Sequence, residues 1–423
     1  MYQNTRMKHV GFISTRFHGT DGVSMEAAKW VEVFENMRFD CYFFSGLSDW
    51  NPKKSMIVPE AFFGHPRIKS LHEHFFGIKA RRVEYTEEIH AIRKELKEAL
   101  YRFIRKFDID LLIIENAISI PLHIPLGLAV TELITETNIP AVGHHHDFYW
   151  ERERFMVNCV NDYITMAFPP SLNSLIHVVI NSEARKMLSY RRGLSSYIVP
   201  NVFNYDQKAP GIDDYNKGLK QDIGLEEDDL LFLQPTRIIQ RKGIESAIEM
   251  VHRLNNPKIK LVITHSGKDE GTAYYNRIIS YADLLKVPLV IRPEKFGSHR
   301  SMGPDGEKIY SIWDIYPHAD LVTYPSSYEG FGNAFLEAVF FRKPVLVNRY
   351  SIYQSDIEPL GFDVIAMNHY ISDEVLASVQ DILRDEKRRL AMVDKNYELA
   401  SRHFSYEILV QKIKTLLLHF GHI

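Results

Sequence analysis

Cysteine is scarce in this chain, and long apolar runs are missing from it. The two cysteines, Cys41 and Cys159, are too few for a disulfide framework, and such usage is typical of a reducing compartment. No stretch approaches the ~18–20 apolar residues that a membrane-spanning helix needs. The apolar stretch in the N-terminal segment is too short for a signal-peptide core. These absences predict a soluble protein of the cytoplasm.

Neither sign of charge dominates the sequence. Lys and Arg together number 51 and Asp and Glu together 54, so the formal net charge is −3. A charge this small argues against a protein that coats nucleic acid, and we expect no nucleic-acid partner. Apolar residues make up 45% of the 423 residues and charged residues 25%, which is ordinary for a globular chain. At about 150 residues per domain, this length predicts two or three domains.

The two halves of the chain show one pattern, in which short β-rich apolar runs alternate with longer helical patterns. Such alternation predicts parallel sheets with crossover helices. The expected strands of the first half lie at residues 9–14, 41–45, 111–114, 141–144 and 178–181. Those of the second half lie at residues 230–234, 260–264, 289–292, 320–324 and 344–348. The clearest helix is Thr86–Phe107, whose apolar residues recur at three- and four-residue steps.

The stretch 199–218 carries Pro and Gly with few apolar residues, and it is the best linker in the chain. We expect an N-terminal Rossmann-like domain at residues 1–203 and a C-terminal Rossmann-like domain at residues 204–405. Residues 406–423 then form an amphipathic closing helix that packs back toward the first domain. The predicted fold class is α/β, with two doubly wound domains that face each other across a cleft. Such sheets bind ligands at the carboxyl ends of their strands.

A carboxylate pair in a glycine-rich loop is the strongest local signal. In SYEGFGNAFLEA, Glu329 lies just after a predicted strand, and Glu337 lies on a helix that begins near Asn333. Gly330 and Gly332 let backbone N–H groups approach a ligand, and the helix N-terminus favours a diphosphate. The bland alternative is a solvated pair beside an ordinary loop. The strand, the glycines and the apolar helix that follows favour the functional interpretation.

A second candidate is the basic loop PTRIIQRKG at residues 235–243, again between a strand and a helix. Arg237 and Lys242, with Arg241 between them, are fixed cations that suit a leaving diphosphate. Charge-assisted hydrogen bonds of this kind contribute about 1.5–3 kcal/mol each. Taken alone, such a loop is at least as often a solvated helix start.

Three consecutive histidines, His144 to His146, end the strand at residues 141–144 and precede Asp147. Side chains alternate along a strand, so His145 points to the face opposite His144 and His146. This alternation disfavours a zinc site, and we predict no metal site. A single histidine presented to the cleft with Asp147 beside it is favoured, and a histidine satisfied by backbone contacts is the bland alternative.

The loop HGTDGVS at residues 18–24 lacks the full dinucleotide fingerprint, but its glycines admit a phosphate or sugar close to the backbone. The pair Asp108 and Asp110 looks like a metal signature of some sugar transferases. It precedes the strand at residues 111–114 and so lies at the amino end, away from ligands. We interpret it as a turn.

In their chain order these segments resemble glycosyltransferase family 4, whose members are retaining enzymes of the GT-B fold. The resemblance covers nearly the whole chain. The residues that carry it are Gly22, His146, Asp147, Val199–Asn201, Arg237, Lys242, Gly243, Glu329, Glu337 and His403–Tyr406. Val202 departs from the pattern, since glycine is usual after Asn201, and this affects only the local turn.

The resemblance implies a role for each matching residue. Arg237 and Lys242 would hold the donor diphosphate and stabilise its departing charge. Glu329 would contact the donor hexose near the reacting centre, and Glu337 would bind the ribose hydroxyls. His146 would touch the hexose and shape the reaction site. Together Glu329, Arg237, Lys242 and His146 would form the catalytic set.

The remaining implied contacts concern the two substrates. The donor would also meet the loop around Gly22 and the glycine-rich segment, namely Gly330, Phe331, Gly332 and Asn333. The acceptor site is not defined by the sequence, and Asp21 and Asp147 are its candidates. The family implies a reaction without metal or other cofactor, with the nucleotide-sugar as co-substrate and the anomeric configuration retained.

The function implied by the resemblance is transfer of a hexose from a nucleotide-diphosphate sugar, of the UDP-glucose or GDP-mannose type, to a hydroxyl acceptor. Two alternatives stay open: a non-catalytic nucleotide- or sugar-binding protein, and an epimerase or phosphorylase on a similar fold. The oligomeric state is not predicted.

A basic amphipathic segment at residues 67–82 is not explained by this function. Its basic residues face a single acid, Glu73, and an apolar stripe runs through it. Peripheral contact with an anionic membrane at the inner face, binding of a phosphorylated acceptor, and core packing with a solvated basic face are three interpretations of it.

Overall fold

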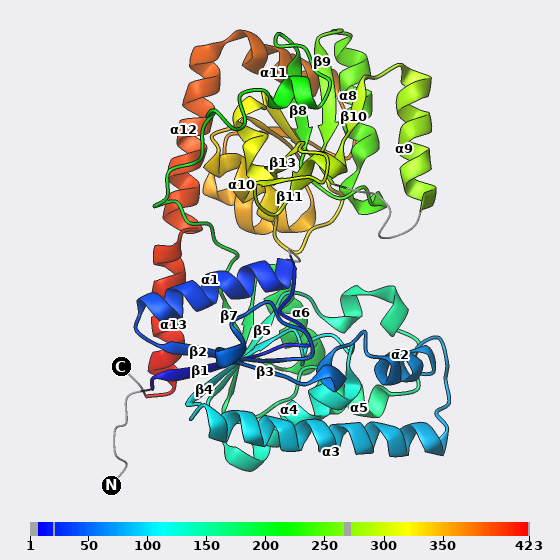
Figure 1. The fold of residues 1–423 in the computed structure, drawn as a ribbon, viewed down its shortest axis with the longest axis vertical. Helices are drawn as coiled ribbons and strands as arrows, with labels where there is room; N and C mark the ends of the chain where they lie inside the picture. Colours follow the sequence, from blue (N-terminus) through cyan, green and yellow to red (C-terminus); the bar gives the residue numbers. More distant parts are fainter. Residues whose placement is uncertain (1–6, 20–21, 266–271, 422–423) are drawn as a thin grey trace. The chain divides into compact units, whose positions relative to one another are not determined.

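The computed structural model describes residues 7–19, 22–265 and 272–421, and they form two compact α/β units (Figure 1). Unit 1 consists of Met1–Val202 and Tyr406–Ile423, and unit 2 of Phe203–Ser405. The chain therefore passes between the units at two places. The α/β class with two Rossmann-like sheets is confirmed.

Unit 1 is built on a seven-stranded parallel sheet with the order β3-β2-β1-β4-β5-β6-β7. The strands are β1 (His9–Ile13), β2 (Asp40–Ser45), β3 (Ser55–Ile57), β4 (Leu111–Glu115), β5 (Ala141–His145), β6 (Leu175–Val179) and β7 (Tyr197–Ile198). All five residues of β4, of β5 and of β6 are buried, because helices cover the sheet on both faces.

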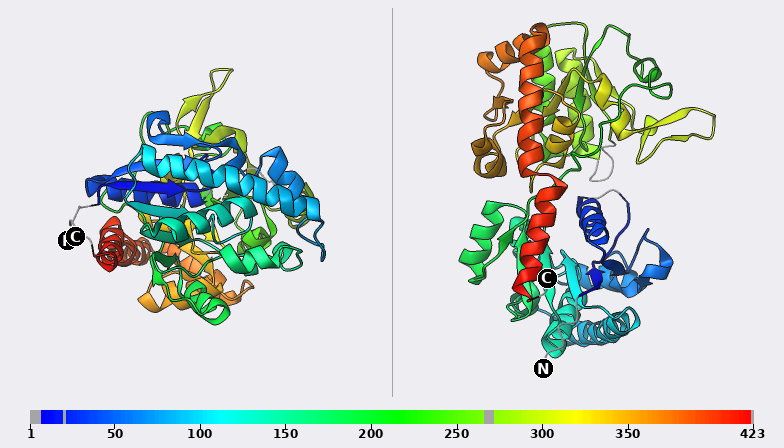
Figure 2. Two further views of the ribbon diagram at one scale, coloured as in Figure 1. Left: turned by 90° about the horizontal axis from the view of Figure 1, so that it is seen from below. Right: turned by 90° about the vertical axis from the view of Figure 1, so that its left-hand side faces the viewer.

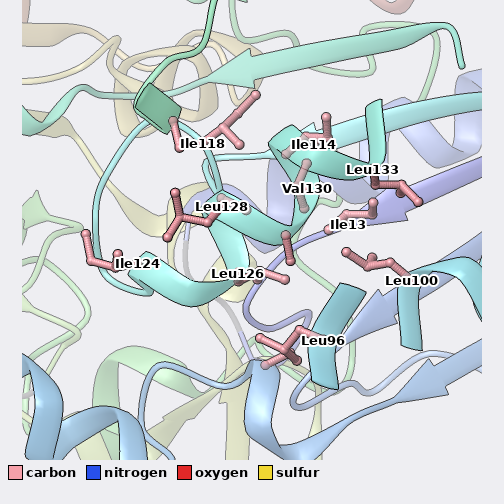
Figure 3. Close-up of a cluster of buried hydrophobic side chains, with 14 of the residues drawn as sticks. Ile13, Leu96, Leu100, Ile114, Ile118, Ile124, Leu126, Leu128, Val130 and Leu133 are labelled. Carbon is pink, nitrogen blue, oxygen red and sulfur yellow. The ribbon is translucent and has the colours of Figure 1, made fainter. Parts of the chain in front are cut away.

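The helices of unit 1 are α1 (Gly22–Asn36), α2 (Pro66–Glu73), α3 (Val83–Lys106), α4 (Ile124–Thr137), α5 (Asn161–Ala167), α6 (Ser182–Arg192) and α13 (Tyr406–His419). Helices α3 and α4 pack on one face of the sheet, and α1 and α13 on the other (Figure 1). Figure 3 shows Leu96 and Leu100 of α3 gathered with Ile13, Ile114 and Leu133. Each such buried side chain stabilises the fold by about 1.5–3 kcal/mol.

Unit 2 repeats the design with a six-stranded parallel sheet of order β10-β9-β8-β14-β15-β16. Its strands are β8 (Leu230–Gln234), β9 (Ile259–Ile263), β10 (Leu289–Ile291), β14 (Leu321–Tyr324), β15 (Val345–Asn348) and β16 (Ile365–Met367). Its helices are α7 (Leu219–Asp222), α8 (Ile244–Leu254), α9 (Thr272–Leu285), α10 (Asn333–Phe340), α11 (Asp373–Arg384) and α12 (Glu386–His403). The stretch from β14 into α10 carries Glu329 and Glu337.

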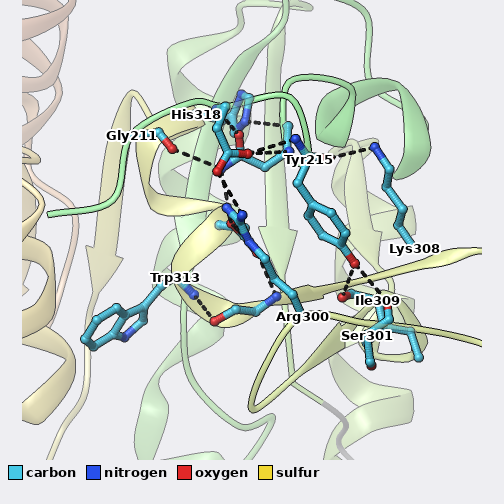
Figure 4. A network of polar contacts seen from close by, with 12 residues as sticks. Gly211, Tyr215, Arg300, Ser301, Lys308, Ile309, Trp313 and His318 are labelled. Atoms are coloured by element: carbon cyan, nitrogen blue, oxygen red, sulfur yellow. Dashed lines mark hydrogen bonds and ion pairs between the residues drawn. The ribbon is translucent and has the colours of Figure 1, made fainter.

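A small second sheet in unit 2 joins β11 (Phe296–Gly297), β13 (Lys308–Ser311) and β12 (Ser301–Met302). Its β12–β13 hairpin extends away from the main sheet of unit 2 (Figure 2). Figure 4 shows the polar network at its base, in which Arg300 is paired with the buried Asp314. The Tyr215 hydroxyl donates to the carbonyl oxygens of Ser301 and Ile309 at 2.8 and 2.9 Å.

The stretch 199–218 is irregular in structure and contains the boundary between the two units, between Val202 and Phe203. Val199 and Val202 are buried in the core of unit 1, and Tyr205 is buried in unit 2, where its hydroxyl donates to the carbonyl of Leu336 at 3.3 Å. Asn216 is fully buried and donates to Asp314 at 3.1 Å. A few buried side chains anchor this linking stretch, although its apolar content is low.

One predicted strand is displaced. The expected strand at residues 178–181 begins earlier and spans Leu175–Val179. His177 interrupts the apolar run of the sequence, yet it is a strand residue with 4% exposure and contacts Nε2 of His145 through Nδ1 at 2.9 Å. Asn181 lies beyond the strand, and its side chain caps α6 by accepting from the N–H of Ala184.

Candidate active site

The basic loop of unit 2 joins the carboxyl end of β8 to the start of α8. A short 3-10 turn, Gln240–Lys242, ends at Gly243, which has φ of 60°. A Cβ atom at residue 243 would lie 2.4 Å from the carbonyl oxygen of Pro325. Only glycine satisfies both conditions. The loop is thereby held tightly against the segment that follows β14 and carries Glu329.

Lys242 and Arg241 both bind the carboxylate of Glu329. The Lys242 ammonium donates to Oε1, and the Arg241 guanidinium donates to Oε2 at 2.8 Å. The Lys242 and Glu329 side chains are only 10% and 8% exposed. Arg241 also donates to the carbonyl of Tyr328 at 3.1 Å. The structure thus brings together two predicted site residues, Lys242 and Glu329, from segments 87 positions apart.

Lys242 and Glu329 are both buried, and each affects the pKa of the other. Burial lowers the pKa of Lys242, an effect opposed in part by Glu329. Burial would raise the pKa of Glu329, but the charges of Lys242 and Arg241 outweigh it and lower that pKa. Glu329 is therefore an ionised carboxylate inside the protein. Its two partners leave the loop with an excess of positive charge, which suits a polyanionic ligand.

Arg237 and Glu337 are the other two predicted charged residues of unit 2, and the charge of Arg237 adds to the lowering of the Lys242 pKa. Arg237 is exposed, just beyond the end of β8. Glu337, on α10, accepts a hydrogen bond from the hydroxyl of Tyr316 at 2.9 Å and a longer one from the indole N–H of Trp313 at 3.4 Å. Tyr316 is fully buried, so the carboxylate of Glu337 is fixed from the core side.

The glycine-rich segment enters α10 as the sequence indicated, with Asn333 as the first helical residue. Gly332 has φ of 133°, and a Cβ there would lie 2.6 Å from the hydroxyl of Tyr350. Gly330 is half-buried. The ring of Phe331 is 3% exposed and packs against Phe404, so its side chain is a core group. Only its backbone is left for a donor contact.

In unit 1 the histidine segment divides as the alternation predicted. His144 and His146 contact Glu115, the last residue of β4, whereas His145 contacts Ser119 and His177 on the opposite face. Gly22 is the first residue of α1, and open space surrounds the position that a Cβ there would take. Asp21 lies outside the described residues.

Glu115, His144 and His146 are the residue types that bind metals, and their ligand atoms all lie within 4.8 Å. Tetrahedral zinc ligands at 2.0–2.2 Å from the metal stand roughly 3.3–3.6 Å apart. The two ring nitrogens lie only 3.0 and 2.9 Å from the same Oε2 atom of Glu115. These shorter separations are those of direct hydrogen bonds, and we treat the three residues as a hydrogen-bonded cluster.

Asp147 is held at the end of the same segment. Its carboxylate accepts from Asn116 at 3.0 Å and from the Nε of Arg152 at 2.7 Å. The Arg152 side chain is 41% exposed. The result is a fixed carboxylate and guanidinium directly after the histidines.

Two other segments, the pair Asp108 and Asp110 and the basic segment 67–82, have structural contacts. Asp110 precedes β4, and its carboxylate accepts from the backbone N–H groups of Lys8 and His9 at 2.8 and 3.0 Å, so it has a structural role. In segment 67–82, Arg67 pairs with Glu88, and Arg81 pairs with Asp162. Ile68, Leu71 and Phe75 of its apolar stripe are part of the core of unit 1, whereas Ile78 is exposed. These contacts favour core packing over the other two interpretations.

Sequence reasoning missed three partners of the predicted residues. Glu115 was passed over, although a charge ending the apolar run LLII was a signal. Tyr316 and Trp313 had no signal, because aromatic residues near a strand usually belong to the core. The binding of Glu329 by Arg241 depends on a contact between distant segments, which spacing does not reveal.

No helix in the described part of the chain combines the length and apolarity needed to span a membrane.

Residues 307–399 match the model of the family described as glycosyl transferases group 1. The chain is 34% identical over 381 residues to the mannosylglucosylglycerate synthase of Petrotoga mobilis, covering 85% of this chain and 86% of that protein. It is 30% identical over 424 residues to the Thermotoga maritima protein of the same name, covering 92% and 95%.

The fold is shared with solved structures at low sequence identity. The structure of Anabaena Alr3699/HepE in complex with UDP and glucose superposes with a TM-score of 0.64 at 13% identity, over 97% of this chain and 99% of that one. The fold is thus that of the GT-B glycosyltransferases. The chain belongs to the glycosyl transferases group 1 family, consistent with glycosyltransferase family 4, and it is a glycosyltransferase.

Proposed function

We propose that the protein transfers a mannosyl residue from a GDP-mannose-type donor to the glucosyl unit of glucosylglycerate. The observation that carries this proposal is the name shared by two relatives that match 85% and 92% of the chain. That name describes mannose, glucose and glycerate in one product. A transferase that forms one glycosidic bond per reaction adds the terminal sugar last, which makes mannose the transferred sugar.

The charged residues of unit 2 suit the donor side of this reaction. Cleavage of the sugar–phosphate bond leaves a diphosphate with additional negative charge, and preorganised cations stabilise such a leaving group. Arg237 and Lys242 supply them, while Glu329 contacts the hexose and Glu337 the ribose hydroxyls. Gly330, Gly332 and Asn333 would present backbone N–H groups.

We further propose that the anomeric configuration is retained and that no metal ion is required. Lys242 and Arg237 would take the place of a cation at the diphosphate. The acceptor hydroxyl would attack the anomeric carbon as the sugar–phosphate bond breaks, and its proton would pass to the departing diphosphate oxygen. The products are then the new glycoside and the protonated nucleoside diphosphate.

On the acceptor side, the carboxylate of glycerate is the distinguishing group. Asp147 stays our candidate for binding an acceptor hydroxyl. Arg152, which its carboxylate orients, carries the guanidinium that matches a carboxylate. We expect this pair to select an anionic acceptor over a neutral one.

The test is an assay of purified protein with GDP-mannose or UDP-glucose against glucosylglycerate, with glycerate, glucose and glucosylglycerol as controls. The expected result is nucleoside diphosphate release with GDP-mannose that glucosylglycerate accelerates and glucosylglycerol does not, and a mass increase of one hexose in the product. NMR of the new anomeric proton reports the configuration, and a parallel reaction with chelator reports metal dependence. If neither glucosylglycerate nor glucosylglycerol accelerates nucleoside diphosphate release, the proposed acceptor class is excluded.

A further inference from the structure

A buried carboxylate in unit 1 joins two histidines at the carboxyl end of the sheet. Nδ1 of His144 lies 3.0 Å and Nε2 of His146 lies 2.9 Å from Oε2 of Glu115. The side chains of Glu115, His144 and His146 are 0%, 1% and 9% exposed. Of the three, His146 is the one that reaches the surface.

The strand register produces this arrangement. Glu115 of β4 is paired directly with His144 of β5, and His146 follows two positions later on the same face. The ring of Trp30 on α1 covers His144, with centroids 4.4 Å apart. The backbone N–H of His146 donates to Oδ1 of Asn116 at 2.9 Å. The His146 ring is therefore fixed both at its backbone and at Nε2.

We propose that Glu115 is a positioning residue for the transfer reaction. Its carboxylate holds the Nε2–H of His146, which leaves Nδ1 as the ring nitrogen that meets the donor hexose. The inference rests on the proposed function, and on the contact between His146 and the donor hexose that the family resemblance implies. Glu115 itself is buried and touches no substrate; it acts through His146.

The charges around the ring favour a donor at Nδ1. Burial lowers the pKa of His146, but the hydrogen bond and charge of Glu115 outweigh it, and Glu26 of α1 and Asp147 act in the same direction, so the pKa is raised. Burial lowers the pKa of the neighbouring His144. Glu115 stays ionised because both histidines bind it. Of the two histidines, His146 is the one that takes the proton, and its Nδ1–H is a charge-assisted donor to a sugar hydroxyl.

The inference predicts a specific kinetic pattern for Glu115→Gln. The loss of one charge-assisted hydrogen bond converts to a fall in kcat of about 10- to 100-fold. The KM for the nucleotide-sugar should change less than about threefold, since unit 2 holds the diphosphate. The decline in kcat with rising pH, which reports loss of the His146 proton, should move to lower pH in the variant.

A double-mutant cycle separates positioning from a structural role. If Glu115 acts through His146, then Glu115→Gln added to His146→Gln lowers kcat no further than His146→Gln alone. Glu132→Gln, on α4 of the same unit and ion-paired with Lys97, serves as the control and should leave kcat and its pH profile unchanged. Thermal unfolding of each variant reports whether the fold is intact.

Several results would overturn the inference. The inference fails if the losses of kcat multiply in the double variant, or if Glu115→Gln has the wild-type pH profile. It also fails if His146→Gln retains full kcat, or if the cluster binds one equivalent of metal that a chelator removes. Histidine NMR gives a readout without turnover: the His146 resonance, assigned by its loss in His146→Gln, should titrate above pH 6.5 in the wild-type protein and lower in Glu115→Gln. If the wild-type protein transfers no sugar, the proposed function fails, and this titration still decides the coupling.

Discussion

The ammonium group of Lys242 is ion-paired with the carboxylate of Glu329 inside unit 2, and Arg241 binds the other oxygen of that carboxylate. A pair this buried costs desolvation of both charges. Removal of either partner leaves the other uncompensated, so variants of this pair report on stability as well as on catalysis.

Lys242→Ala should lower kcat by on the order of 10²–10³, as for loss of one preorganised donor to a developing anion. Steady-state kinetics with the nucleotide-sugar measures the effect, and thermal unfolding separates it from loss of fold. Lys258→Ala removes an exposed lysine of unit 2 paired with Asp228 and is the control. A Lys242 variant within threefold of wild type would contradict the assignment.

Glu329→Gln should reduce turnover while sparing nucleotide affinity, because the carboxylate is assigned to the hexose and not to the diphosphate. Isothermal titration with the nucleoside diphosphate should give a Kd within about threefold of wild type, against a kcat loss of tenfold or more. Equal losses in both would mean that Glu329 serves only to hold Lys242 and the fold.

Tyr316→Phe should weaken binding of the nucleoside diphosphate without changing kcat. The substitution removes the hydrogen bond that fixes Glu337, and a net hydrogen bond of about 0.5–1.5 kcal/mol corresponds to a two- to tenfold rise in Kd. Tyr310→Phe, whose hydroxyl binds Asp222 elsewhere in unit 2, is the matched control. Identical Kd values for the two variants would remove Glu337 from the ribose site.

Gly243→Ala should destabilise the protein by at least about 2 kcal/mol, since the new Cβ meets the Pro325 carbonyl and the backbone has positive φ. Urea or thermal unfolding measures it. At Gly211 open space surrounds a Cβ, so Gly211→Ala should be close to neutral. If both substitutions shift Tm equally, the result would contradict the close contact between Gly243 and the carbonyl of Pro325.

Acid should destabilise unit 1 through its buried histidines. Burial lowers the pKa of His177 from 6.5 to about 4 and also lowers that of His145 well below its ordinary value. Between these values the unfolded chain binds protons that the folded chain does not, so stability is full above pH 6.5 and falls as pH decreases toward 4. The slope per histidine reaches about 1.4 kcal/mol per pH unit.

This pH effect is measured as Tm between pH 7.5 and 5. Other groups also titrate in this range, so the comparison is between curves: His177→Gln should show a shallower decline than wild type. His299 is exposed, so the control variant His299→Gln should follow the wild-type curve. Parallel curves for His177→Gln and wild type would rule out a neutral, buried His177 as the cause.

The sequence predicted the main sheets well because strands buried on both faces are continuous apolar runs. The strand Leu230–Gln234 was predicted with its observed bounds. The strand that contains His177 was displaced, since a buried polar residue is tolerated only through a partner, here His145, that lies far away in sequence. The small sheet of unit 2 went unpredicted because its strands are short and half-exposed, which leaves no apolar run to find.

For the site, the sequence indicated which segments carry charge at strand ends but not how the charges pair. Lys242 and Glu329 were both named, yet their contact depends on β8 and β14 being neighbours in the sheet. The partners of Glu115 were not predictable for the same reason, since they lie on β5 and just beyond it. Pairing between adjacent strands is a property of topology, and periodicity alone does not contain it.

The bridge between Phe203 and Ser405 brings the entry and exit of unit 2 side by side, with the Phe203 N–H donating to the Phe404 carbonyl at 2.8 Å. Unit 2 is thus a single uninterrupted insertion between Val202 and Tyr406. The two junctions lie side by side in space, although they are far apart in sequence. Recombination at both would exchange unit 2 as one segment and leave the sheet of unit 1 and its helix α13 unchanged. A lineage built this way can replace the whole of unit 2 through one continuous stretch of gene, without rebuilding the core of unit 1.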